Sequence, residues 1–237
     1  MNAHFVDVWQ GRLNLPAETL GRLDLLLSED ERSKAQSFKF PHLRDRYIAA
    51  RGMLRQTLAG YLAADPAGLR FVTGDYGKPA LAGDALHFNV SHTADALIIA
   101  IADIADIADI GVDIETVKPH RNLDSLAERC FSEREYRGWR QLAEDEQLLV
   151  FYRLWTKKEA FVKAVGRGIA VGVERCEFEW VRDGRLLAIP AEYGPAAAWR
   201  VHELEVDAGF SAALVTPDAR YDLRHLMLGR DLDGFQR

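Results

Sequence analysis

The chain has 237 residues, enough for one large domain or two small ones, and 48% of them are apolar. Its net charge of −6 argues against nonspecific binding of nucleic acid, and its two cysteines are too few for a disulfide framework. Residues 1–9 lack the basic and apolar segments of a secretory signal, and the longest apolar stretch, residues 96–102, is far shorter than a membrane span. We therefore expect a cytoplasmic protein that binds neither nucleic acid nor a membrane.

The first quarter of the chain is expected to form a strand and two helices. Alternation over residues 4–9 predicts the strand. Ser28 and Glu31 form a capping box, so a helix is expected to start there and to end at Pro41. Apolar residues at helical spacing predict a second helix over residues 43–62. The other face of this helix carries the basic side chains Arg44, Arg46, Arg51 and Arg55. These arginines either bind an anion or form an ordinary solvated surface.

Strands dominate the next part of the chain. They are expected at residues 69–72, 86–91, 95–102 and 109–116, with a turn at residues 74–79. Over residues 101–109 the triplet Ile-Ala-Asp occurs three times in succession, which is too short for a solenoid. We interpret this repeat as a duplication that lengthens a strand or hairpin, and we assign no metal site to its aspartates.

The second half of the chain is expected to begin with helices and to end with strands. Ser132 and Glu135 form another capping box, and a long helix is predicted over residues 144–165, with Gly166 as its stop. Strands are expected at residues 175–181, 186–189, 199–206 and 210–216, with a hairpin turn at Asp183-Gly184. The segments 87–101 and 202–215 are loosely similar hairpins, which hints at two related α/β halves, residues 1–116 and 117–237.

Two acids stand out in the strand predicted over residues 109–116. Side chains two residues apart in a strand share a face, so Asp113 and Glu115 lie on the same side of Gly111-Val112-Asp113-Ile114-Glu115. A divalent cation with a preference for hard oxygen ligands, such as magnesium, would relieve their mutual repulsion. A solvated face of an edge strand is the alternative interpretation.

A second cluster falls in the long helix. Trp155, Glu159 and Lys163 are each four residues apart and form one stripe, shortly before Gly166-x-Gly168. Glu159 could complete a site of three carboxylates, and Lys163 could hold a phosphate. An ordinary surface ion pair between Glu159 and Lys163 is the alternative.

The third cluster combines Gly77-Lys78-Pro79 with Phe88-Asn89-Val90-Ser91-His92. Lys78 beside a rigid proline can present a fixed charge, and Ser91 and His92 can donate hydrogen bonds to phosphate oxygens. A Ser-His nucleophile pair is disfavoured, because adjacent residues of a strand point to opposite faces. Three acids and several basic groups without an obvious nucleophile favour metal-assisted displacement at a phosphate.

These three motifs, together with Trp155-x-x-Lys158-Glu159-Ala160-x-x-Lys163-x-x-Gly166-x-Gly168, resemble in order and spacing those of the 4′-phosphopantetheinyl transferase superfamily. The length resembles the long, surfactin-type (Sfp-type) branch. The motifs span residues 77–168, and residues 38–55 resemble the basic N-terminal region of the family less sharply. The resemblance implies an α+β (mixed α/β) fold of two similar halves in a pseudo-two-fold arrangement, each with antiparallel strands packed on helices. It also implies a monomer.

The resemblance further implies roles for individual residues. Asp113, Glu115 and Glu159 resemble the magnesium ligands, and Asp113, Glu159 and Lys163 resemble the catalytic residues. Lys163 also resembles the contact to the pyrophosphate of coenzyme A. The other side chains that the resemblance assigns to coenzyme A are Arg46, Arg51, Lys78, Ser91, His92 and Lys158.

The implied reaction is transfer of phosphopantetheine to an acyl or peptidyl carrier protein. A carrier serine attacks the β-phosphate of coenzyme A and 3′,5′-ADP leaves, with Glu159 or a metal-bound water that it orients as the base. Two other functions stay open: a noncatalytic coenzyme A-binding module, and a scaffold protein whose motifs arise by chance. The candidates for docking of the carrier protein are Phe131, Tyr136, Trp139 and Arg140. The alternative interpretation of these residues is ordinary core packing with one surface charge.

Overall fold

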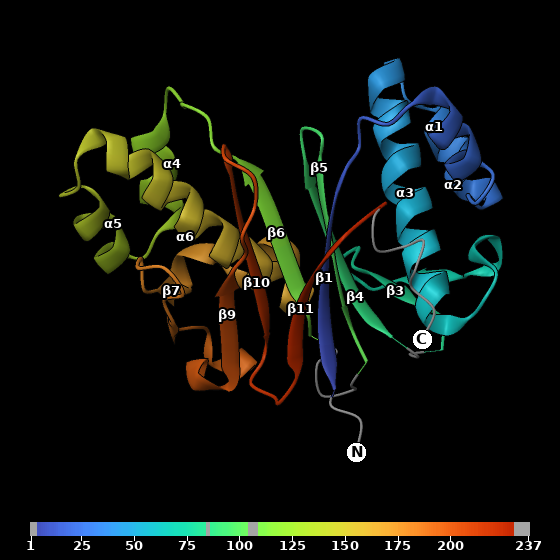
Figure 1. The fold of residues 1–237 in the computed structure, drawn as a ribbon. Coiled ribbons are helices and arrows are strands. Elements are labelled where there is room, and N and C mark those ends of the chain that lie inside the picture. Colours follow the sequence, from blue (N-terminus) through green and yellow to red (C-terminus); the bar gives the residue numbers. More distant parts are fainter. Residues whose placement is uncertain (1–3, 84–85, 104–108, 230–237) are drawn as a thin grey trace.

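The computed structural model describes residues 4–83, 86–103 and 109–229. Helices α1–α3 flank the strands on one side and α4–α6 on the other (Figure 1). The first elements in chain order are β1 (Phe5–Arg12), α1 (Ala17–Asp24), α2 (Glu29–Gln36), α3 (Pro41–Leu62), η1 (Pro66–Gly68), β2 (Phe71–Thr73), β3 (Pro79–Leu81), β4 (His87–Thr93), β5 (Ala96–Ala102) and β6 (Gly111–Thr116). They are followed by α4 (Leu123–Cys130), α5 (Glu133–Trp139), α6 (Glu144–Val165), η3 (Gly168–Val171), η4 (Val173–Arg175), β7 (Glu177–Phe178), β8 (Leu186–Ala188), η5 (Ala191–Tyr193), η6 (Ala196–Ala198), β9 (Trp199–Glu203), β10 (Phe210–Pro217) and β11 (Asp222–Met227).

The strands form two main sheets, with the orders β11-β1-β5-β4 and β6-β10-β9. All neighbours within them are antiparallel except β1 and β11, which are parallel. Two small antiparallel pairs, β2-β3 and β7-β8, complete the described strands. The predicted α+β fold with antiparallel strands packed on helices is thus confirmed.

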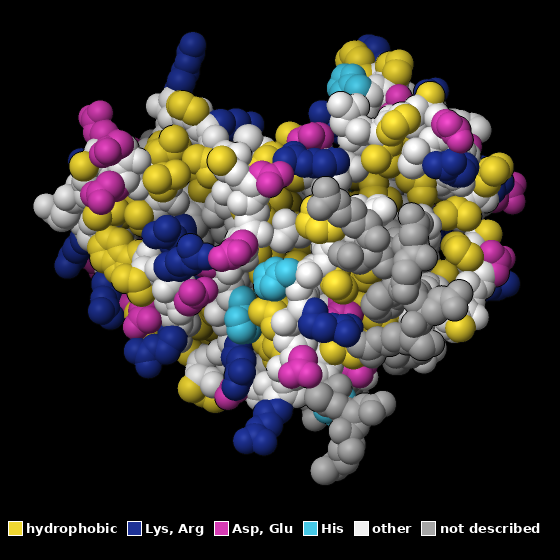
Figure 2. All heavy atoms as spheres, in the orientation of Figure 1, with side chains coloured by type: hydrophobic (Ala, Val, Ile, Leu, Met, Phe, Trp, Pro, Cys, Tyr) yellow, Lys and Arg dark blue, Asp and Glu magenta, His cyan; other side chains and the backbone are white. Residues whose placement is uncertain are grey.

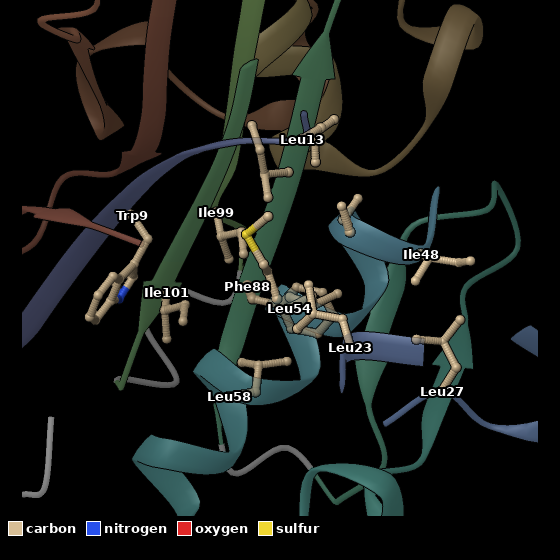
Figure 3. Close-up of a cluster of buried hydrophobic side chains, with 14 of the residues drawn as sticks. Trp9, Leu13, Leu23, Leu27, Ile48, Leu54, Leu58, Phe88, Ile99 and Ile101 are labelled. Atoms are coloured by element: carbon tan, nitrogen blue, oxygen red, sulfur yellow. The ribbon is translucent and has the colours of Figure 1, made fainter. Parts of the chain in front are cut away.

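The core is built in layers by strands that are buried on both faces. In β5 the large side chains Leu97, Ile99 and Ile101 pack toward α3, in the cluster drawn in Figure 3. The alternate residues, mostly alanines, face the other main sheet together with Val112 and Ile114 of β6. Successive side chains of β5 point to opposite faces, and because both faces are buried, the strand reads as a continuous apolar run.

One strand from each predicted half of the chain pairs within the sheet of the other half. β6 precedes residue 117 but pairs with β10, and β11 lies near the other end of the described chain but pairs with β1. The division of the chain at residue 116 stays a prediction, and the sheets tie the segments on its two sides together.

Most predicted elements are confirmed, with specific exceptions. Both capping boxes form, and α6 ends at Gly166, whose φ is 67°. The prediction that Pro41 ends a helix is wrong, because Pro41 is the first residue of α3, where its missing N–H costs nothing. The sequence did not place α1, β3, α4 or β11. Of the Ile-Ala-Asp repeat, residues 104–108 lie outside the described residues.

Within the described ranges, every helix is too short or too polar to cross a membrane. On the face shown in Figure 2, lysine and arginine side chains are interspersed with aspartate and glutamate. This mixed pattern differs from the continuous basic surface that nucleic-acid-binding proteins present.

Candidate functional site

The candidate site lies where α6 crosses β6. Gly111 makes the crossing possible, because a Cβ at this position would lie 2.0 Å from the carbonyl oxygen of Ala160 and 2.3 Å from the nitrogen of Ala164. Without that side chain the helix backbone can lie directly on the strand. Asp113 and Glu115, which share the face of β6 toward α6, thereby come close to Glu159 and Lys163 on the helix.

Asp113 is buried at the centre of the site. Its Oδ1 accepts hydrogen bonds from Lys163 Nζ at 2.6 Å and from Ser91 Oγ at 2.9 Å. Its Oδ2 is equally buried and has no hydrogen-bond partner among the described residues. A buried carboxylate oxygen without a donor is costly, so this atom is available to a cation or another donor.

Glu115 and Glu159 have raised pKa values for related reasons. Burial is the largest cause for Glu115, and the charge of Asp113 adds to it, while hydrogen bonding to Trp155 and Thr93 acts against it. Burial also raises the pKa of Glu159, as do the charges of Asp113 and Glu115. The three acids therefore repel one another in a shielded place, which is typical of functional sites.

Lys78 reaches this region from the turn before β3. Its Nζ donates a hydrogen bond of 2.8 Å to the carbonyl of Ala164, near the C-terminus of α6. Burial lowers the pKa of Lys78 to about 8. The side chain also lies against Gly166, so the structure places the cluster that contains Gly77-Lys78-Pro79 in contact with the end of the cluster in the long helix.

Ser91 and His92 point in different directions, as the strand geometry predicts. Ser91 is buried, and its Oγ interacts with Asp113, Lys163 and the backbone N–H of Ile114. The side chain of His92 is exposed to solvent. Partial desolvation nevertheless lowers the pKa of His92, and the charges of Lys163 and Arg46 lower it further. Ser91 and His92 therefore form no nucleophile pair, and His92 lies beside two cations.

The two arginines assigned to coenzyme A differ in their surroundings. Arg51 is paired with Glu31, its Nε lying 2.7 Å from Oε1, and the buried Arg55 binds Oε2 of the same glutamate at 2.6 Å. Arg46 takes part in no hydrogen bond or ion pair between described residues. The structure therefore places Arg46 near His92 with its guanidinium uncommitted, whereas Arg51 belongs to an ion cluster that joins α2 to α3.

Lys158 lies outside the site. It is fully buried, and its Nζ lies 2.8 Å from Glu135, the glutamate of the second capping box. It also donates hydrogen bonds to the carbonyls of Val173 and Cys176. Because adjacent residues of a helix point about 100° apart, Glu159 reaches the site while Lys158 points into the C-terminal core.

The aromatic residues proposed for carrier docking are mostly core residues. Phe131 and Trp139 are buried and contact each other edge to face at 6.0 Å. Tyr136 is half-buried and Arg140 is exposed. Of the four candidates, only Tyr136 and Arg140 present surface to a partner.

Sequence reasoning gave no role to Asn89, although it lies in a motif, and it missed Thr93. Asn89 Oδ1 accepts a hydrogen bond from the backbone N–H of Val112, and Thr93 Oγ1 lies 3.3 Å from Oε2 of Glu115. Both alternate with Ser91 along β4, so the period of two in Asn89-x-Ser91-x-Thr93 is the signal that could have identified them.

The chemistry of the three acids fits a divalent cation, although the described residues contain no group of three or more His, Cys, Asp or Glu side chains gathered closely enough to count as a formed metal site. The fit rests on the buried, partnerless Oδ2 of Asp113 and on the raised pKa values of the other two acids. Carboxylate oxygens are the ligands that magnesium prefers.

Comparison with known proteins identifies the family of this chain. Residues 109–215 match the family model of the 4′-phosphopantetheinyl transferase superfamily, a segment that contains β6, α6 and most of β10. The 4′-phosphopantetheinyl transferase HetI of Nostoc sp. (strain PCC 7120) is 37% identical over 213 residues, covering 88% of this chain and 86% of that protein. The chain belongs to the 4′-phosphopantetheinyl transferase superfamily. It is an enzyme of this class, and the resemblance of its motifs is confirmed.

Other members of the superfamily match less closely. The 4′-phosphopantetheinyl transferase Sfp of Bacillus subtilis (strain 168) is 31% identical over 218 residues, covering 85% of this chain and 93% of that protein. AcpT of Escherichia coli O157:H7 is 36% identical over 124 residues, covering 52% of this chain and 58% of that protein. The coverage of HetI and Sfp extends the 4′-phosphopantetheinyl transferase match well beyond the segment of the family model.

Proposed function

We propose that this protein transfers the 4′-phosphopantetheine group of coenzyme A to a serine of an acyl or peptidyl carrier protein, with magnesium as the cofactor and 3′,5′-ADP as the second product. The observation that carries the proposal is the cluster at the crossing of α6 and β6, where Lys163 binds Asp113 while Glu115 and Glu159 lie close by. We further propose that the protein acts in the cytoplasm as a monomer.

The residues of the site would divide the work of binding. Asp113, Glu115 and Glu159 would hold magnesium, which screens phosphate charge when it is bound. Lys163 would bind the pyrophosphate, and Lys78, His92 and Arg46 would supply further positive charge to the nucleotide. Arg51 and Lys158 are left out of this set because Arg51 joins α2 to α3 through Glu31, and Lys158 is fully buried beside Glu135 outside the site.

The transfer itself is a direct displacement. The oxygen of the carrier serine forms a bond to the β-phosphorus of coenzyme A, and the bond from that phosphorus to the bridging oxygen breaks, so that 3′,5′-ADP leaves. The carboxylate of Glu159 would accept the serine proton, and its raised pKa brings it closer to the pH at which a general base is efficient. Lys163 would hold the pyrophosphate while the bond breaks.

The loop after β6 suits an acidic carrier helix. Lys118, His120 and Arg121 are exposed and follow Glu115 by only a few residues. Complementary charge steers a partner and fixes its orientation more than it adds affinity. Tyr136 and Arg140 on α5 stay candidates for the same partner.

Intact-mass measurement of an apo carrier protein, incubated with this protein, coenzyme A and magnesium, tests the proposal. We expect a gain of about 340 Da, one phosphopantetheine on serine, that is lost when a chelator is added. If no carrier gains mass while coenzyme A still binds, the protein is a noncatalytic coenzyme A-binding module. If coenzyme A does not bind either, the proposed function is wrong.

A further inference from the structure

The edges of the two main sheets meet at β4 and β6, and side chains join them there. β4 belongs to one sheet and β6 to the other. The N–H of Val112 donates to Asn89 Oδ1 at 2.9 Å, and the N–H of Ile114 donates to Ser91 Oγ at 3.2 Å. Side chains of β4 thus take the place that strand carbonyls occupy in a backbone ladder.

The hydroxyls of β4 also bind the acids of β6 in register. Ser91 Oγ donates to Asp113 Oδ1 at 2.9 Å, and Thr93 Oγ1 donates to Glu115 Oε2 at 3.3 Å. Thr93 Oγ1 is equally 3.3 Å from the hydroxyl of Thr116, which can fill its acceptor site. Two hydroxyls spaced two residues apart therefore engage two acids with the same spacing.

We propose that Thr93 is a positioning residue, whose hydroxyl holds the carboxylate of Glu115 beside Asp113 so that both acids serve one divalent cation. A β-branched side chain suits this task because its χ1 angle is restricted. Thr93 lies in one sheet and Glu115 in the other, so the hydrogen bond also fixes the acid relative to the opposite sheet. The inference rests on the proposed function for the role of the cation.

Two substitutions separate the hydroxyl from the shape of the side chain. Thr93→Val removes the hydroxyl at nearly constant volume, and Thr93→Ser keeps it. Thr57→Val is a matched control, because Thr57 is buried in α3 and, among the described residues, its hydroxyl bonds only to the carbonyl of Met53 in the same helix. The measurement is Mn²⁺ binding, followed by electron paramagnetic resonance of free Mn²⁺ with coenzyme A present and no carrier protein, alongside thermal unfolding.

We expect Thr93→Val to weaken Mn²⁺ binding about 10-fold, the lower end of the effect of losing a hydrogen-bond partner of a metal ligand. Thr93→Ser should restore binding to within about twofold, and Thr57→Val should leave it unchanged, with similar melting temperatures throughout. Unchanged Mn²⁺ binding in Thr93→Val would overturn the inference, and so would an equal loss in Thr93→Ser and Thr93→Val that follows their melting temperatures. Absence of Mn²⁺ binding by the unsubstituted protein would overturn it as well, whereas Mn²⁺ binding without any transfer to carriers would refute only the proposed function.

Discussion

The ammonium group of Lys163 lies 2.6 Å from Oδ1 of Asp113, across the contact between α6 and β6. The lysine side chain is 29% exposed and that of the aspartate only 5%, so the cation reaches solvent while the acid does not. A phosphate that arrives from solvent would therefore meet Lys163 before it meets Asp113.

This arrangement predicts that Lys163→Ala mainly impairs the handling of coenzyme A. A hydrogen bond to a charged group contributes about 1.5–3 kcal/mol, so we expect the KM for coenzyme A to rise about 10- to 100-fold. Steady-state transfer assays at saturating magnesium and carrier measure this. Arg137→Ala, which removes an exposed ion pair on α5, is the control and should leave KM unchanged. An unchanged KM in Lys163→Ala would remove Lys163 from the site.

Glu159→Gln should abolish transfer while the protein stays folded. Loss of a general base lowers turnover by about 100-fold or more. Because burial and neighbouring acids raise the pKa of Glu159, its charged form is disfavoured in the fold, and the neutral amide should raise the melting temperature when divalent cations are absent. Glu146→Gln, in the acidic first turn of the same helix, is the control. Normal turnover of Glu159→Gln at saturating magnesium would contradict the assignment.

Gly111→Ala should destabilise the protein strongly. The new Cβ would collide with the backbone of α6 at Ala160 and Ala164, and such overpacking costs about 3 kcal/mol when the backbone must move. Gly21→Ala in α1 is the matched control, since a Cβ there meets nothing within 4 Å. It should stabilise by about 0.5–1 kcal/mol, because glycine is unfavourable inside a helix. Urea unfolding of both variants measures the difference, and equal stabilities would show that α6 does not need to lie so close to β6.

Substitution of Arg46 should affect coenzyme A binding, whereas substitution of Arg51, which also lies on α3, should affect stability. Arg46→Ala is expected to raise the KM for coenzyme A with little change in melting temperature, because its guanidinium has no partner among the described residues. Arg51→Ala is expected to lower the free energy of unfolding by about 1–3 kcal/mol, because Glu31 loses one of its two arginines. Parallel kinetics and unfolding curves check both expectations. A larger KM effect in Arg51→Ala than in Arg46→Ala would reverse the assignment.

Loss of the charge of Lys78 should weaken coenzyme A binding at alkaline pH. With a pKa of about 8, Lys78 carries its charge below that pH and loses it as the pH rises, so its attraction for phosphate is present at pH 7 and fades above about pH 8. We expect the KM for coenzyme A to rise between pH 8 and pH 10 in the unsubstituted protein. In Lys78→Met the KM should be higher at pH 7 and lack this rise, and an identical pH profile in both proteins would exclude Lys78 as its cause.

The sequence predicts the site to the extent that the site depends on local geometry. The common face of Asp113 and Glu115 follows from strand alternation, and the stripe of Glu159 and Lys163 follows from the helical period. Lys158 shows where this reasoning stops, because its partner Glu135 is fixed by the packing of α5 on α6 and not by any local pattern. Likewise β11 was missed because its burial is partial and its parallel pairing with β1 joins residues about 217 positions apart.

The exchange of β6 and β11 between the sheets also decides how the protein should respond to force. β1 and β11 run parallel, with Phe5 opposite Asp222 and Gln10 opposite Met227. A load applied at Phe5 and Met227 would pull the two strands along each other in opposite directions, so their ladder bonds would have to break together and not one after another. We expect the molecule to resist stretching between these two points far more than between Phe5 and Ala102, which are nearly opposite each other across the antiparallel pair of β1 and β5 and would unzip.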